Sequence, residues 1–332
     1  MKYIGVDISK STFVAAFPTT KGYVTKEFEN TPRGIHKFIG MVPSDHVVVM
    51  EATGNYCYTL LLLLHQANRH MSLVNPKQIK HFARMMMTVT KTDAKDACMI
   101  AQYGEKMNPA LYEIPSQTIL ILKQKRTVLT QLKKQHLSTK NLLEAIQVLP
   151  YADKSCIRSL EHTIGFIEKQ IKALEGEITT LANTEYNMLM NRLTSIKGIG
   201  IAVATALIIA TGGFTYFNNA KQFSRYIGVC PTICKSGTSI NINGHINRSG
   251  DQHLRSLLFV AAWTAIRHNS ACREMYERMR SQGKPSKVAL IAVSNKLIRQ
   301  CFAIVNSGTT YIDGFVSDNP QYRGSVNSDH RS

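Results

Sequence analysis

The chain has 332 residues, of which 44% are hydrophobic, so it is long enough for two domains with packed cores and too apolar for wholesale disorder. Lys and Arg total 40 against 22 Asp and Glu, which leaves a formal charge of +18 at pH 7. This excess favours a nucleic-acid partner over a metabolite enzyme, and the chain lacks the basic amphipathic helix or lipid motif of a membrane-surface protein.

Residues 1–112 alternate between strand and helix patterns. The segments KYIGVDIS, STFVAAFP, YVTKEFEN, HVVVMEATG and HMSLVN are typical of strands, and PRGIHKFIGMV and YTLLLLLHQAN are typical of helices. A further helix follows VNP. The resulting β-β-β-α-β-α-β-α order predicts an α/β domain with a mixed sheet covered by helices. Because this pattern begins at once and the apolar run 60–64 is too short to span a bilayer, we expect no leader, no membrane segment and a cytoplasmic location.

Residues 113–188 carry two apolar stripes with helical spacing on either side of Pro150. The first stripe is Leu122, Leu129, Leu132, Leu143 and Ile146. The second stripe is Ile164, Ile167, Ile171, Leu174, Ile178 and Leu181. Both predict a helical coiled-coil hairpin, and stripes of this length suit a pair within one chain and a coiled coil between chains equally well.

Residues 189–305 form a mainly helical (all-α) domain in this interpretation, and residues 306–332 form a flexible polar tail. Apolar helices are expected around 251–268 and 285–305, with the loop CPTICKSGTSININGHINRSGD before them. The stretch IKGIGIAVATALI resembles a helix-hairpin-helix turn. Its Gly198 and Gly200 either expose backbone amides to a phosphate or serve only as a tight turn between packed helices.

Four acidic residues stand where two strands end and a helix begins. Asp7 follows the first strand and Glu51 ends the fourth, at positions where buried acids need a partner or a metal. Asp93 and Asp96 share one side of a predicted helix with Thr92 as its N-cap. Four convergent carboxylates suit two Mg²⁺ or Mn²⁺ ions that cleave phosphodiesters. Taken alone, Asp93 and Asp96 are better explained as residues that complement the helix dipole, and it is the strand-end pair of Asp7 and Glu51 that favours a metal.

The ordered set YIGVDISK, VVMEATGNY, LVNPKQIKHFA and KTDAKDA resembles the DEDD transposases of insertion-sequence family one-ten, which are relatives of the RuvC resolvases and the Piv-type DNA invertases. The similarity continues through LTSIKGIG, FSRYIGVCPTICKSGTS and INRSGDQHLRSLL. It therefore covers nearly the whole chain. It implies a ribonuclease-H-like (RuvC-like) nuclease domain at 1–112, with Asp7, Glu51, Asp93 and Asp96 as metal ligands.

The resemblance also implies a catalytic serine in the domain at 189–305. Ser236 matches the family's SG step, with Ser239 as the fallback, while Asn247 and Arg248 stand where a serine–lysine pair is common. The implied protein is a bacterial transposase or site-specific recombinase that stores the cut strand as a phosphoserine. Its implied partners are donor and target DNA duplexes, a structured non-coding guide RNA, and further copies of the chain that complete composite active sites near the nucleoid.

Basic residues surround the acidic cluster and the serine loop. A track for nucleic acid is predicted, although each group taken alone is typical of a solvated helix face. The predicted contacts are Lys77, Lys80, Arg84, Lys91, Lys95, Lys235 and Arg248, with Gly198 and Gly200. Lysines and Arg126 on the first hairpin helix extend the track.

Three alternatives stay open at this point. The first is a RuvC-like, structure-specific DNA nuclease or resolvase that uses the four acids without serine chemistry. The second is a kinase, because YIGVDISK also resembles a phosphate loop of the actin-like ATPases, although no second such loop follows. The third is an inactive nucleic-acid-binding adaptor.

Overall fold

The computed structural model describes residues 2–52, 54–87, 92–230, 234–236, 240–242, 246 and 250–314. Two compact units, Met1–Ile114 and Pro115–Ser332, make up the chain. Each unit has its own core, and each is described by itself.

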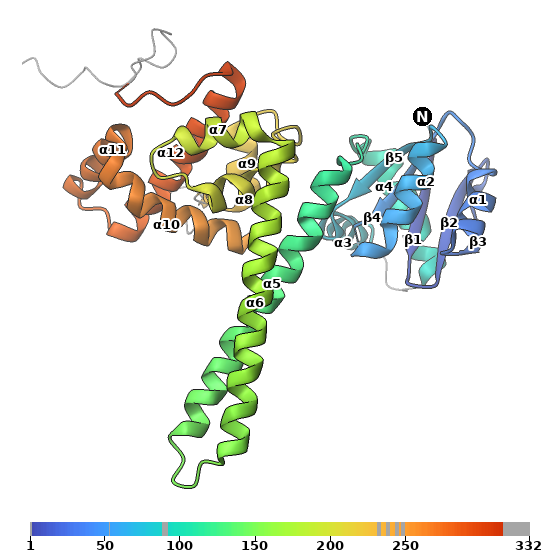
Figure 1. Cartoon of the computed structure of the whole chain (residues 1–332). Coiled ribbons are helices and arrows are strands. Elements are labelled where there is room, and N and C mark those ends of the chain that lie inside the picture. Colours follow the sequence, from blue (N-terminus) through green and yellow to red (C-terminus); the bar gives the residue numbers. More distant parts are fainter. Residues whose placement is uncertain are drawn as a thin grey trace, which may run out of the picture. The chain divides into compact units, whose positions relative to one another are not determined.

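The first unit is built on a five-stranded mixed sheet with strand order β3-β2-β1-β4-β5 (Figure 1). Strand β2 is antiparallel to β1 and β3, whereas β1, β4 and β5 are parallel. Its strands are β1 (Lys2–Ile8), β2 (Thr12–Thr19), β3 (Gly22–Glu29), β4 (His46–Glu51) and β5 (His70–Val74). Its helices are α1 (Pro32–Ile39), the short 3-10 helix η1 (Asn55–Cys57), α2 (Tyr58–Gln66), α3 (Pro76–Met85) and α4 (Asp93–Met107). The predicted order and mixed sheet are confirmed, and they are compatible with a ribonuclease-H-like fold.

Apolar side chains cover both faces of this sheet, as the unbroken β-branched run of β4 predicts. Helices α1 and α2 pack on one face, where Val48 and Met50 of β4 are fully buried. Helices α3 and α4 pack on the other face with Val47 and Val49. A sheet covered on both sides leaves only its edges and strand ends for polar chemistry.

Helix α4 approaches strand β1 so closely that only glycine fits between them. A Cβ atom on Gly5 would lie 2.1 Å from the Ala97 carbonyl oxygen and 2.3 Å from the Ala101 amide nitrogen. Both contacts are with backbone, so neither can be relieved by rotating a side chain. The glycine in YIGVDISK is therefore a packing requirement of this helix–strand pair.

Gly5→Ala is expected to destabilise the protein by about 3 kcal/mol, because the helix and the strand must move apart. Gly176→Ala on α6 (Lys154–Glu185) is the matched control, and it is expected to change the free energy of unfolding in the opposite direction. No atom lies within 4 Å of its added Cβ, so better helix propensity should stabilise by about 0.5–1 kcal/mol. Urea unfolding followed by circular dichroism measures both, and equal midpoints for Gly5→Ala and wild type would contradict the packing argument.

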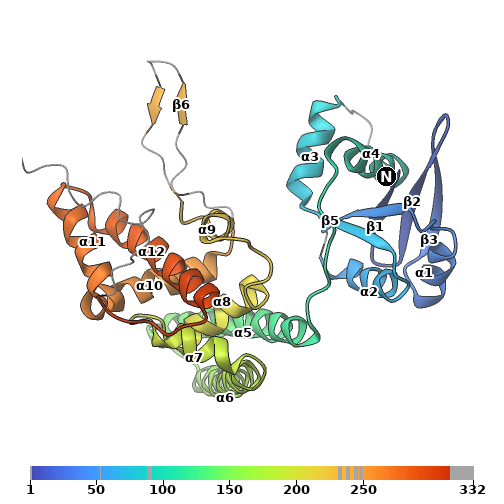
Figure 2. The same ribbon diagram turned by 90° about the horizontal axis from the view of Figure 1, so that it is seen from above.

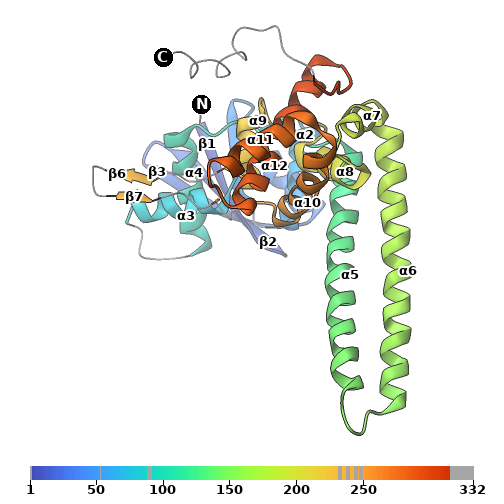
Figure 3. The ribbon, with the colours of Figure 1, turned by 90° about the vertical axis from the view of Figure 1, so that its left-hand side faces the viewer.

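The second unit opens with a helical hairpin formed by α5 (Gln117–Gln147) and α6 (Figure 3). The predicted stripes face the partner helix, with Leu122, Ile167 and Ile178 buried and the remaining stripe residues half-buried. His136 and Thr139, which interrupt the stripe in sequence, are half-buried there too. In this structure the two helices thus pair with each other within one chain.

The remainder of this unit is a helical body with a small two-stranded sheet (Figure 2). Its helices are α7 (Asn187–Ser195), α8 (Ile201–Thr211), α9 (Ala220–Ile227), α10 (Gln252–His268), α11 (Ser270–Ser281) and α12 (Ser286–Ser307). Strands β6 (Cys234–Ser236) and β7 (Ile240–Ile242) pair antiparallel where only a loop was expected. In the described part of the chain, α12 alone is long and apolar enough to cross a membrane, but Leu290, Val293 and Leu297 bury it in the core of the unit.

Candidate active site

Asp7 and Glu51 lie side by side at the carboxyl ends of two paired strands. Strands β1 and β4 run parallel with Val6 opposite Met50, so Asp7 and Glu51 are the next residues on their strands. Neighbouring strands are about 4.8 Å apart. Both acids are half-buried. The predicted meeting of the two strand ends is therefore present.

Both acids belong to the same face of the sheet. Side chains alternate along a strand, and Tyr3, Val47 and Val49 pack under helices α3 and α4. Asp7 and Glu51 continue this alternation on β1 and β4. The carboxylates therefore stand at the end of the face that α4 covers.

The direction of α4 brings its first turn to this end of the sheet. Ala97 lies against Gly5, while a Cβ atom on Gly104 would lie 2.8 Å from the ring of Tyr3. The helix therefore runs antiparallel to β1, and its N-terminus points toward the end of the strand that carries Asp7.

Asp93 and Asp96 occupy the first turn of α4, as predicted. Thr92 is the N-cap, and its hydroxyl accepts a hydrogen bond from the Lys95 amide at 3.3 Å. Asp93 is exposed and Asp96 is half-buried, and both share the helix face of the buried Ile100. The DxxD pair is thus on the side of the helix that packs on the sheet.

The four acids share one end of the unit without converging on a single point. Within the described residues, no group of three or more His, Cys, Asp or Glu side chains is arranged so that it could hold a metal ion. Strand pairing joins Asp7 and Glu51, and the helix brings the other two acids to the same end of the sheet.

Basic residues predicted to contact nucleic acid are exposed where the structure describes them. Lys77, Lys80 and Arg84 lie on the solvent side of α3, whose buried side carries Ile79 and Phe82. Lys95 is exposed on α4. Lys91 and Arg248 lie outside the described residues, as does the side chain of Lys235.

The two glycines of the predicted turn have different surroundings. Gly198 has φ +106°, and an added Cβ would lie 2.7 Å from the Cβ of Ala265 on α10, so its absent side chain serves helix packing. Gly200 is the N-cap of α8, and an added Cβ would meet no atom within 4 Å. The turn is therefore a packed connection between two helices, in which Gly198 is required for packing and Gly200 has free space beside it.

Ser236 is the last residue of β6, paired with Ile240 of β7. Strands β6 and β7 form a short hairpin, and Ser236 is in the pair of residues nearest its turn. The Gly- and Ser-rich sequence predicted neither strand. The fallback Ser239 lies outside the described residues, and only the backbone of β6 and β7 is described.

A buried polar network at the base of this segment was also missed by sequence reasoning. Arg126 of α5 forms an ion pair with Asp251, which precedes α10. The two residues are 125 positions apart. The sequence carries no signal for this pair, because its two residues lie in separate segments of the chain.

Comparison with known proteins identifies relatives along the whole chain. Residues 190–277 match the family model described as Transposase IS116/IS110/IS902 family, and residues 4–149 match DEDD_Tnp_IS110, described as Transposase. The chain is 30% identical to the pilin gene-inverting protein of Moraxella bovis over 320 residues, which cover 93% of this chain and 97% of that protein. It is 23% identical to a probable family 20 transposase of Pseudomonas aeruginosa over 344 residues, covering 94% and 98% of the two chains. An IS110 43.6 kDa protein of Streptomyces coelicolor is 33% identical over 155 residues, covering 47% of this chain and 38% of that protein.

Proposed function

The chain belongs to the IS116/IS110/IS902 family of transposases, and from this membership we propose that it is a DNA recombinase that cuts and rejoins strands with a divalent-metal cluster and a serine nucleophile. The observation that carries the proposal is the register of β1 and β4, which sets Asp7 beside Glu51 beneath the first turn of α4. The full-length similarity to a protein named for gene inversion supports DNA as the substrate.

The donor set fits Mg²⁺ or Mn²⁺. Asp7, Glu51, Asp93 and Asp96 offer only oxygen ligands, which hard divalent cations prefer. Asp7 and Glu51 stand at neighbouring positions of two paired strands, where one cation could bind both carboxylates. When bound, the metal stabilises the charge that develops on the phosphate. The acids would hold it at the end of the mixed sheet.

Ser236 supplies the nucleophile in this proposal. Its hydroxyl gives up its proton as the oxygen bonds to the phosphorus, the bond from phosphorus to one deoxyribose oxygen breaks, and that oxygen takes up a proton and leaves as a hydroxyl. The phosphodiester energy is kept in the phosphoserine, so a second strand's hydroxyl can later displace the serine. Such a store would let the strand ends be rejoined without a further energy source.

The remaining partners follow from the same proposal. The acids and the serine belong to different units, and we propose that a homo-oligomer assembles them into composite sites on donor and target duplexes near the bacterial nucleoid. The chain offers basic surface, on α3 and the hairpin helices, without an evident base-reading motif. A structured guide RNA that pairs with both DNAs would supply the sequence choice.

A recombination reporter tests the function. A plasmid carrying the gene with its native flanking DNA is introduced into cells together with a second plasmid, and new junctions are amplified and sequenced. We expect junctions at defined positions in the wild type. Their absence, with the protein folded and expressed, would contradict the proposal.

The guide-RNA part is tested separately by purifying the tagged chain from those cells and sequencing the bound RNA. We expect one structured transcript from the DNA beside the gene. A random sample of cellular RNA would leave only charge-driven binding and would contradict the guided mechanism.

Exchange of Lys77, Lys80 and Arg84 for Gln should weaken DNA binding and make it less sensitive to salt. Three lost phosphate contacts reduce the slope of log affinity against log salt by about 2.7. Titration by fluorescence anisotropy at several salt concentrations measures this slope. A control with the same change in net charge replaces exposed residues of the β3 and α1 region: Lys21, Lys26 and Lys37. An equal effect in that control would show that only total charge matters.

A further inference from the structure

The two ends of the segment that carries Ser236 meet at one fixed base. Helix α9 ends at Ile227, and Gly228 turns the chain away with φ +79°. The chain returns at Gly250, where φ is +126° and an added Cβ would lie 2.1 Å from the carbonyl oxygen of Tyr226. Only glycine fits this close return. The serine therefore projects from a loop whose ends are adjacent.

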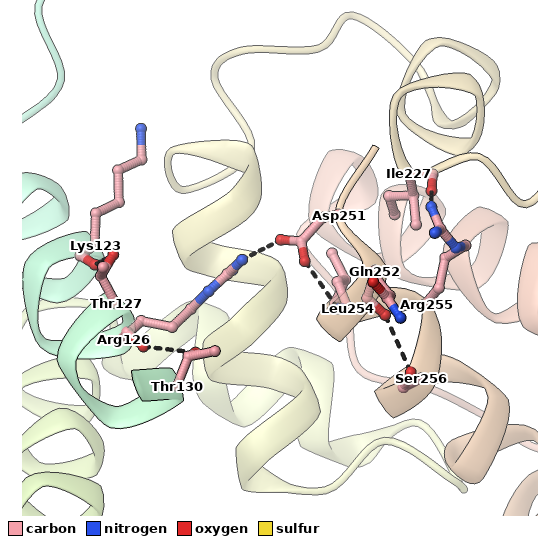
Figure 4. A network of polar contacts seen from close by, with 10 residues as sticks. All are labelled: Lys123, Arg126, Thr127, Thr130, Ile227, Asp251, Gln252, Leu254, Arg255 and Ser256. Carbon is pink, nitrogen blue, oxygen red and sulfur yellow. Dashed lines mark hydrogen bonds and ion pairs between the residues drawn. The ribbon is translucent and has the colours of Figure 1, made fainter. Parts of the chain in front are cut away.

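Side chains from α10 and α12 hold the outgoing end. Arg255 donates from Nη1 to the Ile227 carbonyl at 2.7 Å (Figure 4). Asn295 of α12 contacts both ends of this turn, through Ser224 Oγ at 3.3 Å and Cys230 Sγ at 3.7 Å. These contacts fix the point at which the segment leaves the helical body.

Asp251 holds the returning end in two ways. Its Oδ1 accepts a hydrogen bond from the Leu254 amide at 3.0 Å and so caps α10. Its Oδ2 accepts one from Arg126, which reaches over from α5 (Figure 4). Only 14% of the Asp251 side chain and 23% of the Arg126 side chain are exposed. The pair thus ties the base of the serine segment to the hairpin.

The electrostatics around Arg126 show why this carboxylate is needed. Burial lowers the pKa of Lys123, and the neighbouring Arg126 lowers it further. The same two causes, in the same order, lower the pKa of His253. Burial alone would raise the pKa of Asp251, but the Leu254 amide and Arg126 outweigh it and leave the pKa lowered. Asp251 is therefore the ionised partner of a guanidinium set among other basic groups.

Capping α10 requires Asp251 but not Arg126. Two other cations of this part of the hairpin pair with exposed glutamates of the facing helix: Lys125 with Glu177 and Lys133 with Glu175. Arg126 alone among these three turns toward the root of the serine segment. Its charge is engaged within the protein, which sets it apart from a phosphate contact.

We propose that Arg126 and Asp251 are positioning residues that hold the base of the serine segment, so that Ser236 is presented to the scissile phosphate in one orientation. This rests on the proposed role of Ser236. The pair acts through the backbone at Gly250 and touches neither DNA nor metal.

A double-mutant cycle tests the proposal in the full-length chain. The variants are Arg126→Gln, Asp251→Asn, their combination, and Arg126→Lys. Asn at 251 keeps an oxygen for the Leu254 amide, so α10 remains capped. The measurements are the rate of covalent protein–DNA adduct formation at saturating DNA, and DNA affinity by anisotropy. The probe is a duplex of the native flanking sequence, added with the co-purified RNA.

We expect each single variant to lower the adduct rate at least tenfold with affinity unchanged within about twofold, as for a change in the chemical step alone. The double variant should be no slower than the slower single, because both remove the same contact. Arg126→Lys should recover part of the rate. Glu177→Gln, which breaks the neighbouring ion pair with Lys125 from its acidic side, should react at the wild-type rate.

Several outcomes would overturn the proposal. Multiplied effects in the double variant would show that the residues act independently, and lost affinity in Arg126→Gln at an unchanged saturated rate would make Arg126 a DNA contact. If Arg126→Gln is unfolded in a thermal-unfolding measurement, Asp251→Asn decides, and a wild-type adduct rate in that variant would contradict positioning. Adduct formation by Ser236→Ala would refute the serine role itself. Loss of adduct in Ser236→Ala with full rates in the pair variants would refute positioning alone.

Discussion

Replacement of Asp7 by Asn, or of Glu51 by Gln, is expected to lower the rate of metal-dependent DNA cleavage about a thousandfold. Each change removes a charge from the pair at the ends of β1 and β4 while keeping the shape of the side chain. A bound metal contributes several kcal/mol of charge stabilisation, and about 4 kcal/mol corresponds to this factor. Cleavage of native flanking DNA in increasing Mg²⁺ or Mn²⁺ measures the loss.

Glu27→Gln is the matched control for these two variants, since it makes the same chemical change on the exposed edge strand β3. It should cleave at the wild-type rate. Thermal unfolding of all three variants separates lost chemistry from lost folding. Cleavage by Asp7→Asn at the wild-type rate would remove the acidic cluster from the mechanism.

Ser236→Ala is expected to abolish covalent protein–DNA adducts and strand exchange, with a rate loss of about a thousandfold or more, because no other atom at that position can attack phosphorus. DNA affinity should remain unchanged. Adducts are detected as a shifted band on denaturing gels, and exchange by sequencing of reporter junctions. This variant separates the recombinase from a resolvase, which would continue to cut without its serine.

Ser239→Ala tests the fallback nucleophile in the same assay. If its loss abolishes adducts while Ser236→Ala retains them, the chemistry belongs to Ser239. Ser256→Ala serves as the control, because this exposed serine lies on α10 and its hydroxyl only donates to the Gln252 carbonyl. Wild-type cutting with no adduct in any of these proteins, wild type included, would favour the resolvase.

Local patterns were sufficient to predict most of the sheet unit and the hairpin. The β-branched run of β4, the Pro32 at the start of α1 and the Thr92 cap of α4 each act within a few residues, so sequence alone reveals them. The neighbouring positions of Asp7 and Glu51 also followed, since parallel strands that pair bring their carboxyl ends together.

Features that depend on distant segments were not predictable. Helix α11 has a charged composition and a single buried residue, Cys272, so it carries no apolar stripe to reveal it. The β6–β7 hairpin is hidden in a Gly- and Ser-rich stretch. The ion pair of Arg126 with Asp251 could not be predicted, because the sequence around each residue gives no indication of which distant residue it contacts. Likewise, Gly5 stands out as a motif residue, but its reason appears only when α4 lies against it.

The lengths of the hairpin helices have a mechanical consequence. With 31 residues in α5 and 32 in α6, each arm extends about 45 Å at 1.5 Å per residue. Because the stripes repeat every seven residues, one repeat can be removed from both arms without turning either seam away from its partner. The length of the hairpin can therefore change in evolution in steps of about 10 Å, one seven-residue repeat at a time. Each step leaves the apolar stripes of α5 and α6 facing each other.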